Sequence, residues 1–306
     1  MIVVVCPGQG SQTPGFLEPW LANPAYAEAL GEMSAQSATD LVSAGTVADA
    51  DTIRDTAIAQ PLIVAAGVLA LSALFADGRR AGIGGIAGHS VGEITAAVGA
   101  GVLSSSDALT FVGERGRAMK AAAALSPTGM SAVLGGDETE LLAKLTDLGL
   151  EPANFNGGGQ IVVAGDLDAL AALAADPPAK SRVIPLQVAG AFHTRYMLPA
   201  VPHLAEVAAG LTPVDPGLKL WTNQDGSVVS DGSAFVDLLV GQVSSPVRWD
   251  LCMQAFVAAG VTGIIEVAPA GALVGLAKRA LRGIPTVAIK TPDDLPAAYE
   301  LIDQQA

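Results

Sequence analysis

Cysteine and basic residues are both scarce in this sequence of 306 residues. The two cysteines, Cys6 and Cys252, are too few for a disulfide framework, so we interpret both as reduced core residues. Lys and Arg number 16 against 30 acidic residues, which gives a formal net charge of -14, and no basic run is longer than two. Because binding to nucleic acid needs clustered Lys and Arg, the composition argues against a nucleic-acid partner.

Long apolar runs are also missing. The N-terminal apolar run ends at Cys6 and has no basic lead, unlike a signal peptide. The longest apolar stretch, Leu62–Phe75, has 14 residues, whereas a membrane span needs about 20. We therefore predict that this stretch is a buried helix, and we expect a cytoplasmic protein with no membrane partner.

Apolar residues are nevertheless abundant, because 51% of the chain is hydrophobic and 15% is charged. Ile2–Cys6 is a continuous apolar run, typical of a strand buried on both faces of a parallel sheet. Helical patterns fill most of 24–75, and we expect a break around Gly45 and a new start near Pro61. Further strand candidates lie among helical patterns at Ile83–Ala87, Leu218–Thr222, Gly263–Val267 and Thr286–Ile289. This alternation predicts an α/β fold with a parallel sheet.

The pattern changes in the middle of the chain. Strand-like and helix-like segments follow one another there in the order βαββαβ, which is the ferredoxin-like order. The six segments are Met130–Leu134, Glu138–Leu148, Glu151–Asn154, Gln160–Ala164, Asp166–Ala175 and Arg182–Gln187. We therefore expect a small ferredoxin-like subdomain at 124–189, inserted into an α/β core formed by 1–123 and 190–306.

Gly88-His89-Ser90-Val91-Gly92 matches G-x-S-x-G, the pattern of a nucleophile elbow. A strand pattern precedes it and a helical pattern follows, so a tight turn would expose the serine Oγ beside the free N–H groups of a helix start. We predict that Ser90 is a nucleophile, and a Gly-rich turn with a helix-capping serine is the alternative. The stretch 82–87 loosely fits a dinucleotide fingerprint, but it does not follow a strand as that motif requires.

A serine nucleophile needs a general base, and the chain has three histidines. His89 adjoins Ser90 at a sharp turn, so its side chain should diverge, and we assign it a structural role. His203 lies in a helical pattern and should be solvated. His193 lies where the subdomain returns to the core, and such a junction lines a cleft. We predict that His193 is the base, and a buried histidine satisfied by backbone is the alternative.

Two N–H groups are needed for an oxyanion hole. Val91, the residue after the nucleophile, supplies one of them. Gln9, in the loop after the first strand, is the natural second donor, and an ordinary strand-to-helix turn is the alternative.

Arg115 and Arg117 lie on one helical pattern and point to nearly opposite sides of it, so only one of them can face the serine. An arginine in an acyl pocket would bind a carboxylate with two hydrogen bonds. On these residues alone, a solvated helix arginine is the favoured interpretation of Arg115, and a role in carboxylate binding is the alternative.

With these residues named, the chain resembles the malonyl-CoA:acyl carrier protein transacylases of bacterial fatty-acid synthesis. The resemblance runs from residue 1 to about 290 and rests on seven short segments that occur in order. They are 7–12, 88–93, Arg115 and Gly116 with Met119, 154–156 with 160–165, 191–193, Gln242 with 245–249, and 266–269 with 275–279. Three glycines at 157–159 replace a proline common in this family, which predicts a more flexible hairpin loop.

The resemblance implies a hydrolase-like core with a ferredoxin-like insertion and an active site between them. It implies a Ser90–His193 dyad without an acidic third member, in which a backbone carbonyl in the loop at Gln242 orients the imidazole. It assigns substrate binding to Arg115, Phe192 and Gln242, with Arg115 gripping the malonyl carboxylate. Phe192 resembles the malonyl-type rather than the methylmalonyl-type pocket.

The same resemblance implies malonyl-CoA and acyl carrier protein as partners. Coenzyme A enters as a thioester substrate, so we expect no cofactor and no metal, and we expect a monomer. A carrier protein of fatty-acid synthesis and one of polyketide synthesis both fit the sequence. Because carrier proteins are acidic, docking needs a local basic patch, with candidates Arg117, Lys120, Arg195, Lys278, Arg279 and Arg282.

Two other functions remain open at this point. A serine hydrolase or thioesterase orders its triad as serine, acid and histidine, and no acid is forced here by spacing. A non-catalytic module that binds carrier proteins would not need Gln9, Ser90, Arg115 and His193 together.

Overall fold

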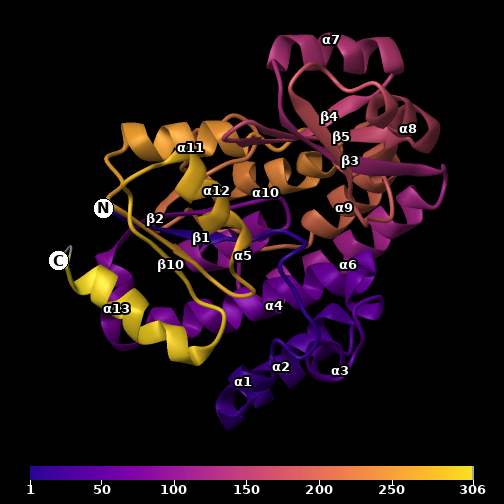
Figure 1. Cartoon of the computed structure of the whole chain (residues 1–306). Helices are drawn as coiled ribbons and strands as arrows, with labels where there is room; N and C mark the ends of the chain where they lie inside the picture. The colour runs from indigo at the N-terminus through magenta and orange to yellow at the C-terminus, as the bar shows by residue number, and fades with distance from the viewer. Residues whose placement is uncertain (305–306) are drawn as a thin grey trace.

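The computed structural model describes residues 1–304, and a six-stranded sheet lies at the centre of its larger part (Figure 1). The strands are β1 (Ile2–Cys6), β2 (Ile83–Gly88), β7 (Lys219–Trp221), β8 (Val228–Val229), β9 (Gly263–Glu266) and β10 (Thr286–Ala288), in the spatial order β10-β9-β1-β2-β7-β8. Every neighbouring pair is parallel except β7 and β8. The predicted α/β core with a parallel sheet is confirmed.

The burial of strand β1 on both faces explains why its sequence is apolar throughout. Ile2, Val4 and Cys6 enter the largest hydrophobic cluster, whereas Val3 and Val5 enter a second cluster on the opposite face of the sheet. Side chains of a strand alternate between faces, so a strand buried on both sides needs an unbroken apolar run.

Helices cover both faces of this sheet. The α-helices outside the small sheet are α1 (Glu18–Leu21), α2 (Pro24–Ser37), α3 (Leu41–Thr46), α4 (Thr56–Leu74), α5 (Gly92–Ala100), α6 (Ser105–Ala123), α9 (Val201–Ala208), α10 (Gly232–Gly241), α11 (Trp249–Ala258), α12 (Ala272–Ala280) and α13 (Leu295–Asp303). Short 3-10 helices are η1 (Thr52–Arg54), η2 (Ala76–Gly82), η3 (Arg195–Ala200), η4 (Gln242–Ser244) and η5 (Pro292–Asp294).

The expected break around Gly45 is confirmed, because α3 ends at Thr46, whereas the expected helix start near Pro61 was wrong. Helix α2 ends at Ser37, because Ala38 adopts a left-handed φ of 50°. Helix α4 starts well before Pro61, because the Asp55 side chain accepts the Ala57 N–H at 3.0 Å and caps the first turn. Pro61 therefore lies inside α4, near its start, where the missing N–H costs one intrahelical bond.

The predicted buried helix is confirmed as the C-terminal part of α4. Among residues 1–304, α4 is the one helix long and apolar enough to cross a membrane, yet 83% of its apolar window is buried inside the protein. It packs against α5 and α6 as the central helix of the core.

A second sheet contains four antiparallel strands in the order β4-β5-β3-β6. Its elements are β3 (Thr128–Gly135), α7 (Glu138–Leu148), β4 (Glu151–Gly157), β5 (Gln160–Asp166), α8 (Leu167–Ala175) and β6 (Ser181–Pro185). This is the predicted ferredoxin-like arrangement. All six elements fall within 124–189, although the exact division of the chain there stays a prediction.

The two faces of the small sheet have different partners. One face packs against α7 and α8 through a cluster that includes Leu141, Leu145 and Leu173. Met130, Ala132 and Val162 belong instead to the cluster of the large core. Strand β4 also meets the core directly, since Phe155 N–H donates to the Val247 carbonyl at 2.9 Å.

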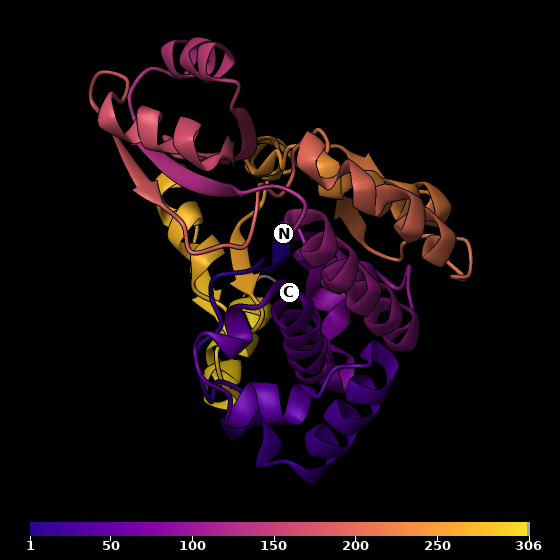
Figure 2. The same cartoon turned by 90° about the vertical axis from the view of Figure 1, so that its right-hand side faces the viewer.

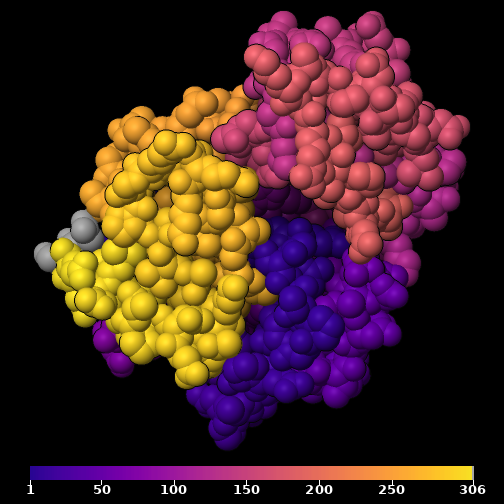
Figure 3. All heavy atoms as spheres, in the orientation of Figure 1, coloured from indigo at the N-terminus to yellow at the C-terminus, as the bar shows by residue number. Residues whose placement is uncertain are grey.

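The small sheet therefore covers one end of the larger part. Figure 2 shows α7 and α8 at the top of the molecule, with the N-terminal helices at the bottom. Figure 3 shows a hollow where the subdomain, the N-terminal residues and the C-terminal part of the chain meet.

Candidate active site

Ser90 lies on the sharp turn between β2 and α5, with a φ of 53°. A residue with a side chain rarely adopts this left-handed conformation, so neighbouring contacts must stabilise it. Asn223 provides two of them, because its Oδ1 accepts the Ser90 N–H at 2.7 Å and its Nδ2 donates to the Gly88 carbonyl at 2.7 Å. The buried Asn223 amide thus forms hydrogen bonds to both sides of the turn.

The glycines of the motif are required by close backbone approach. A Cβ at position 88 would lie 2.0 Å from the Gly92 carbonyl carbon, and a Cβ at position 92 would lie 2.1 Å from the Cys6 carbonyl oxygen. The start of α5 therefore lies directly against the ends of β1 and β2, which is the geometry of a nucleophile elbow.

His193 lies opposite Ser90, with its Nε2 2.6 Å from the Ser90 Oγ. Its other ring nitrogen, Nδ1, is 2.9 Å from the Gln242 backbone carbonyl. A carbonyl can only accept a hydrogen bond, so Nδ1 carries the proton and Nε2 is free to accept from the serine. His193 itself has a left-handed φ of 61°, and its N–H donates to the Val243 carbonyl at 3.0 Å.

The surroundings of His193 keep its imidazole neutral. Burial, followed by the positive charge of Arg115, lowers the pKa of His193 to about 3. At neutral pH the ring is therefore a free base, the state that a serine nucleophile needs from its partner.

Arg115 is 1% exposed and lines the same cavity as Ser90 and His193. Two glutamine side chains hold its guanidinium, since Nη1 donates to Gln60 Oε1 at 2.6 Å and Nη2 to Gln242 Oε1 at 2.7 Å. Burial lowers the pKa of Arg115 to about 10, opposed by the nearby Glu93 carboxylate, so the group stays cationic at neutral pH. Its direct partners here are neutral amides, which leaves the positive charge available to an anionic ligand.

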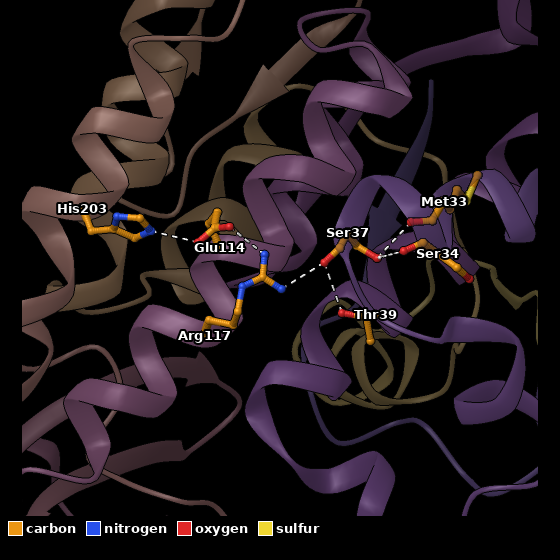
Figure 4. A network of polar contacts seen from close by, with 7 residues as sticks. All are labelled: Met33, Ser34, Ser37, Thr39, Glu114, Arg117 and His203. Atoms are coloured by element: carbon orange, nitrogen blue, oxygen red, sulfur yellow. Dashed lines mark hydrogen bonds and ion pairs between the residues drawn. The ribbon is translucent and has the colours of Figure 1, made fainter.

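Arg117 and His203 belong to a separate network of polar contacts with Glu114 and Ser37 (Figure 4). Arg117 donates to the Ser37 carbonyl at the end of α2 and to Glu114, at 3.0 and 2.8 Å. His203 Nε2 is 2.9 Å from Glu114, and its side chain is 49% exposed. The network ties α9 and α2 to α6, and neither Arg117 nor His203 lines the cavity.

The cavity has a volume of about 490 Å³ and lies between the small sheet and the core. Both predicted oxyanion-hole residues line it, together with Ser90. Val91 is the N-cap of α5, where backbone N–H groups have no intrahelical acceptor. The loop that carries Gln9 lies against the elbow, because a Cβ on Gly8 would be 2.9 Å from the His89 carbonyl oxygen.

Phe192 is buried and lines the cavity next to the imidazole, whereas Gln242 does not line it. Gln242 lies behind the site: its backbone carbonyl meets His193, and its side chain meets Arg115 and the Ser90 carbonyl. The structure thus brings Gln242 to the site as a support for other residues. We assign it no ligand contact.

His89 also lines the cavity, although its side chain diverges from that of Ser90 as expected. Its Nε2 is 2.8 Å from Asn156 Oδ1 in β4, and its ring makes an edge contact with Trp249 at 5.7 Å between centroids. The histidine therefore joins the elbow to the small sheet.

Three buried polar residues of the site were not predicted from the sequence: Gln60, Glu93 and Asn223. Glu93 is in the first turn of α5, where an acidic residue is ordinarily an exposed partner of the helix dipole. Gln60 and Asn223 carry no local pattern, because each acts on residues more than 50 positions away.

No group of three or more His, Cys, Asp or Glu residues that could hold a metal ion occurs within residues 1–304. Cys6 and Cys252 are both free and buried, as expected for reduced core residues.

Comparison with known proteins agrees with this geometry. The family model of the acyl transferase domain matches residues 3–292. A curated malonyl CoA-acyl carrier protein transacylase of Mycobacterium tuberculosis strain H37Rv is 51% identical over 299 residues, which cover 96% of this chain and 98% of that protein.

Two solved structures extend the likeness to the fold. The crystal structure of MCAT from Mycobacterium tuberculosis has a TM-score of 0.95 at 51% identity and covers 97% of this chain and 99% of its own. A malonyl-transacylase solved in complex with its type II PKS acyl-carrier protein has a TM-score of 0.91 at 29% identity, covering 98% of this chain and 99% of its own. With the Ser90–His193 pair, the buried Arg115 and these full-length matches, the chain belongs to the acyl transferase domain family and, within it, to the malonyl CoA-acyl carrier protein transacylases.

Proposed function

We propose that this chain transfers a malonyl group from malonyl-CoA to the phosphopantetheine thiol of an acyl carrier protein through a malonyl-Ser90 intermediate. One observation carries the proposal: a serine in hydrogen-bond contact with a neutral histidine shares a single cavity with a buried cationic arginine. The serine and histidine supply acyl transfer, and the arginine supplies a preference for an acyl group that ends in a carboxylate.

In the first half-reaction the Ser90 Oγ attacks the thioester carbonyl carbon while its proton moves to His193 Nε2. The backbone N–H groups of Gln9 and Val91 stabilise the tetrahedral oxyanion. The intermediate collapses, the carbon–sulfur bond breaks, and the coenzyme A thiolate takes the proton from the imidazolium. Free coenzyme A and malonyl-Ser90 are the products, and His193 is again neutral.

The second half-reaction runs the same chemistry with a new thiol. His193 removes the proton from the carrier protein's thiol, and the thiolate attacks the malonyl-serine carbonyl. When that intermediate collapses, the Ser90 oxygen leaves and recovers the proton from His193. Every group in this cycle belongs to the protein or to its two thiol substrates, so the proposal needs no cofactor.

Arg115 acts at the far end of the acyl group. Its guanidinium binds the malonyl carboxylate and offsets the cost of taking that charge out of water. Phe192 forms part of the apolar wall beside the base. The monomeric state and cytoplasmic location expected from the sequence are part of the same proposal.

The carrier protein should dock beside α12. Of the six basic candidates, Arg117, Lys120 and Arg195 are each paired with an acidic side chain of this chain, Glu114, Asp55 and Glu151 respectively. Lys278, Arg279 and Arg282 are exposed and have no ion pair among the described residues. Arg279 also lines the cavity, so this basic group lies at the cavity's edge.

A serine hydrolase with a triad fits the site less well. A triad needs an acid behind the histidine, but Nδ1 of His193 faces the backbone carbonyl of Gln242. The dyad, the arginine and the family membership together favour transfer over hydrolysis.

Transfer can be tested by following the carrier protein. The enzyme is incubated with malonyl-CoA, freed of small molecules, and mixed with holo carrier protein or with the apo form that lacks the thiol. The proposal predicts a malonyl mass increment on the holo form alone. Release of free malonate in place of carrier loading would indicate a hydrolase.

A further inference from the structure

A buried carboxylate lies directly behind the nucleophile. Glu93, in the first turn of α5, is 1% exposed and does not line the cavity. Both of its oxygens accept hydrogen bonds: Oε1 from the Asn223 backbone N–H at 2.7 Å, and Oε2 from the Gln242 side-chain Nε2. Burial raises the pKa of Glu93 to about 7, and these two donors, the Thr222 side chain and the charge of Arg115 oppose that rise.

Glu93 decides which way the Gln242 amide faces. Gln242 Nε2 donates both to Glu93 and to the Ser90 carbonyl, which is 3.0 Å away. The amide oxygen is therefore left for Arg115, whose Nη2 donates to it at 2.7 Å. If the amide were turned over, its oxygen would meet two acceptors and its NH2 would meet the guanidinium, so no contact would survive.

The orientation of Gln242 matters because Arg115 is held at both ends by amide oxygens. Gln60 accepts from one terminal nitrogen and Gln242 from the other. A carboxylate in either place would neutralise the guanidinium directly and compete with an acidic acyl group. In this arrangement the balancing carboxylate is one residue further away, so the arginine is fixed in position while its charge stays available.

We infer that Glu93 is a positioning residue for acyl selectivity: its carboxylate orients the Gln242 amide, and the amide fixes Arg115 for an acyl carboxylate. The inference rests on the proposed function, because it assumes that Arg115 binds the malonyl group. It adds to that function a residue that touches neither substrate.

The test is the ratio of malonyl to acetyl loading in Glu93→Gln. An amide at 93 keeps the shape of the side chain but has only one acceptor atom. The Asn223 backbone N–H is fixed and takes that acceptor, so the NH2 of residue 93 faces Gln242. Gln242 then turns its own oxygen toward residue 93 and away from Arg115. We expect the malonyl-to-acetyl ratio of kcat/KM to fall about 10-fold, the usual effect of losing one hydrogen bond to a charged group. Acetyl loading should fall less than malonyl loading, because acetyl makes no use of Arg115 and shares only the losses that are common to both acyl groups.

Glu266→Gln is the matched control. Glu266 is also fully buried and also accepts two hydrogen bonds, here from the backbone N–H groups of Leu273 and Val274 at 3.0 and 2.8 Å, but it has no hydrogen bond to Gln242. Loss of the Glu266 carboxylate should change malonyl and acetyl loading equally, because Glu266 does not contact the residues that hold Arg115. An equal fall for both in Glu93→Gln as well would overturn the inference and leave Glu93 a purely structural residue.

A second variant keeps the test decisive if Glu93→Gln folds poorly. Gln242→Leu removes the amide but keeps the backbone carbonyl that meets His193, and it should show the same malonyl-selective loss. Adding Glu93→Gln to Gln242→Leu should not reduce the malonyl-to-acetyl ratio further, because both changes act through the contact between Gln242 and Arg115. Additive losses in the double variant would show that Glu93 acts by another route.

The outcome also separates this inference from the proposed function. A wild-type protein that forms no malonyl adduct would refute both. A normal wild-type adduct combined with an unchanged ratio in Glu93→Gln and Gln242→Leu would refute the inference alone.

Discussion

The Ser90 hydroxyl lies 2.6 Å from His193 Nε2, although the two residues are 103 positions apart in the chain. The serine comes from the turn after β2, and the histidine comes from the segment that returns from the small sheet to the core. Both residues have left-handed backbone angles, so the contact depends on local conformations that other parts of the chain enforce. For Ser90 the main support is Asn223, and for His193 it is the η4 segment.

Removing the base should slow both halves of the reaction. His193→Ala should reduce loading from malonyl-CoA and unloading to the carrier protein by about 10²–10⁴-fold, the usual range for a lost general base. Single-turnover measurement of each half-reaction checks this. A fall of less than about tenfold in both would mean that another group accepts the serine proton.

The rate of acyl loading should not fall near pH 6.5, where an ordinary histidine becomes protonated. The pKa of His193 is lowered to about 3 by burial and then by Arg115, so the imidazole stays neutral as the pH falls through 6.5. Loading from acetyl-pantetheine, which has neither phosphates nor an acyl carboxylate, should therefore be nearly constant between about pH 5 and 8. A loss of activity centred near pH 6.5 would show that His193 titrates like an exposed histidine.

Arg115 should set the preference for malonyl over acetyl. In Arg115→Ala the malonyl carboxylate enters a pocket with no counter-charge, which costs about 3–5 kcal/mol for one lost partner of a buried pair. Taking the lower part of that cost, we expect kcat/KM for malonyl-CoA to fall about 10²–10³-fold and that for acetyl-CoA to stay equal or rise. Arg115→Lys should restore malonyl transfer only in part, because a point charge cannot reproduce the planar fork.

Arg117→Ala is the control for this comparison. Arg117 is two residues away on the same helix and is occupied by Ser37 and Glu114, so its loss should affect both acyl groups alike. A malonyl-selective loss in Arg117→Ala and not in Arg115→Ala would show that the wrong face of α6 has been assigned.

Charge reversal beside α12 should weaken the carrier protein selectively. Lys278→Glu with Arg282→Glu should raise the apparent KM for the carrier protein and leave malonyl-CoA loading unchanged. Arg279 is kept intact in this experiment because it lines the cavity and could touch either thiol substrate.

Lys219→Glu is the control for the change in net charge. Lys219 is exposed at the N-terminal end of β7, the end of the parallel sheet remote from the elbow. If Lys219→Glu raised the carrier KM as much per charge as the pair at 278 and 282, long-range repulsion and not local docking would explain the effect.

Local sequence was sufficient to predict most of the elements. The βαββαβ order was predictable because each strand and helix of the small sheet carries its own periodicity and is bounded by turn residues. The boundary near Pro61 was not predictable in this way, since the Asp55 cap outweighs the proline as a signal for where α4 begins. The two-residue strand β8 was also missed, because it is too short to show an alternation.

The catalytic candidates were predictable because their motifs are local, whereas their supports were not. G-x-S-x-G specifies Ser90 through the tight packing of its own glycines. Glu93, Gln60 and Asn223 act across the fold, and a glutamate in the first turn of a helix gives no sign that it will be buried. Such residues become visible only when the elements are assembled.

The most direct test of the central claim is the mass of the intact protein after brief incubation with malonyl-CoA. A malonyl-serine intermediate should add about 86 mass units, the mass of a malonyl group replacing one hydrogen. Peptide mapping should place it on Ser90, and Ser90→Ala should show no increment. A malonyl adduct of normal yield on the Ser90→Ala protein would show that Ser90 is not the nucleophile.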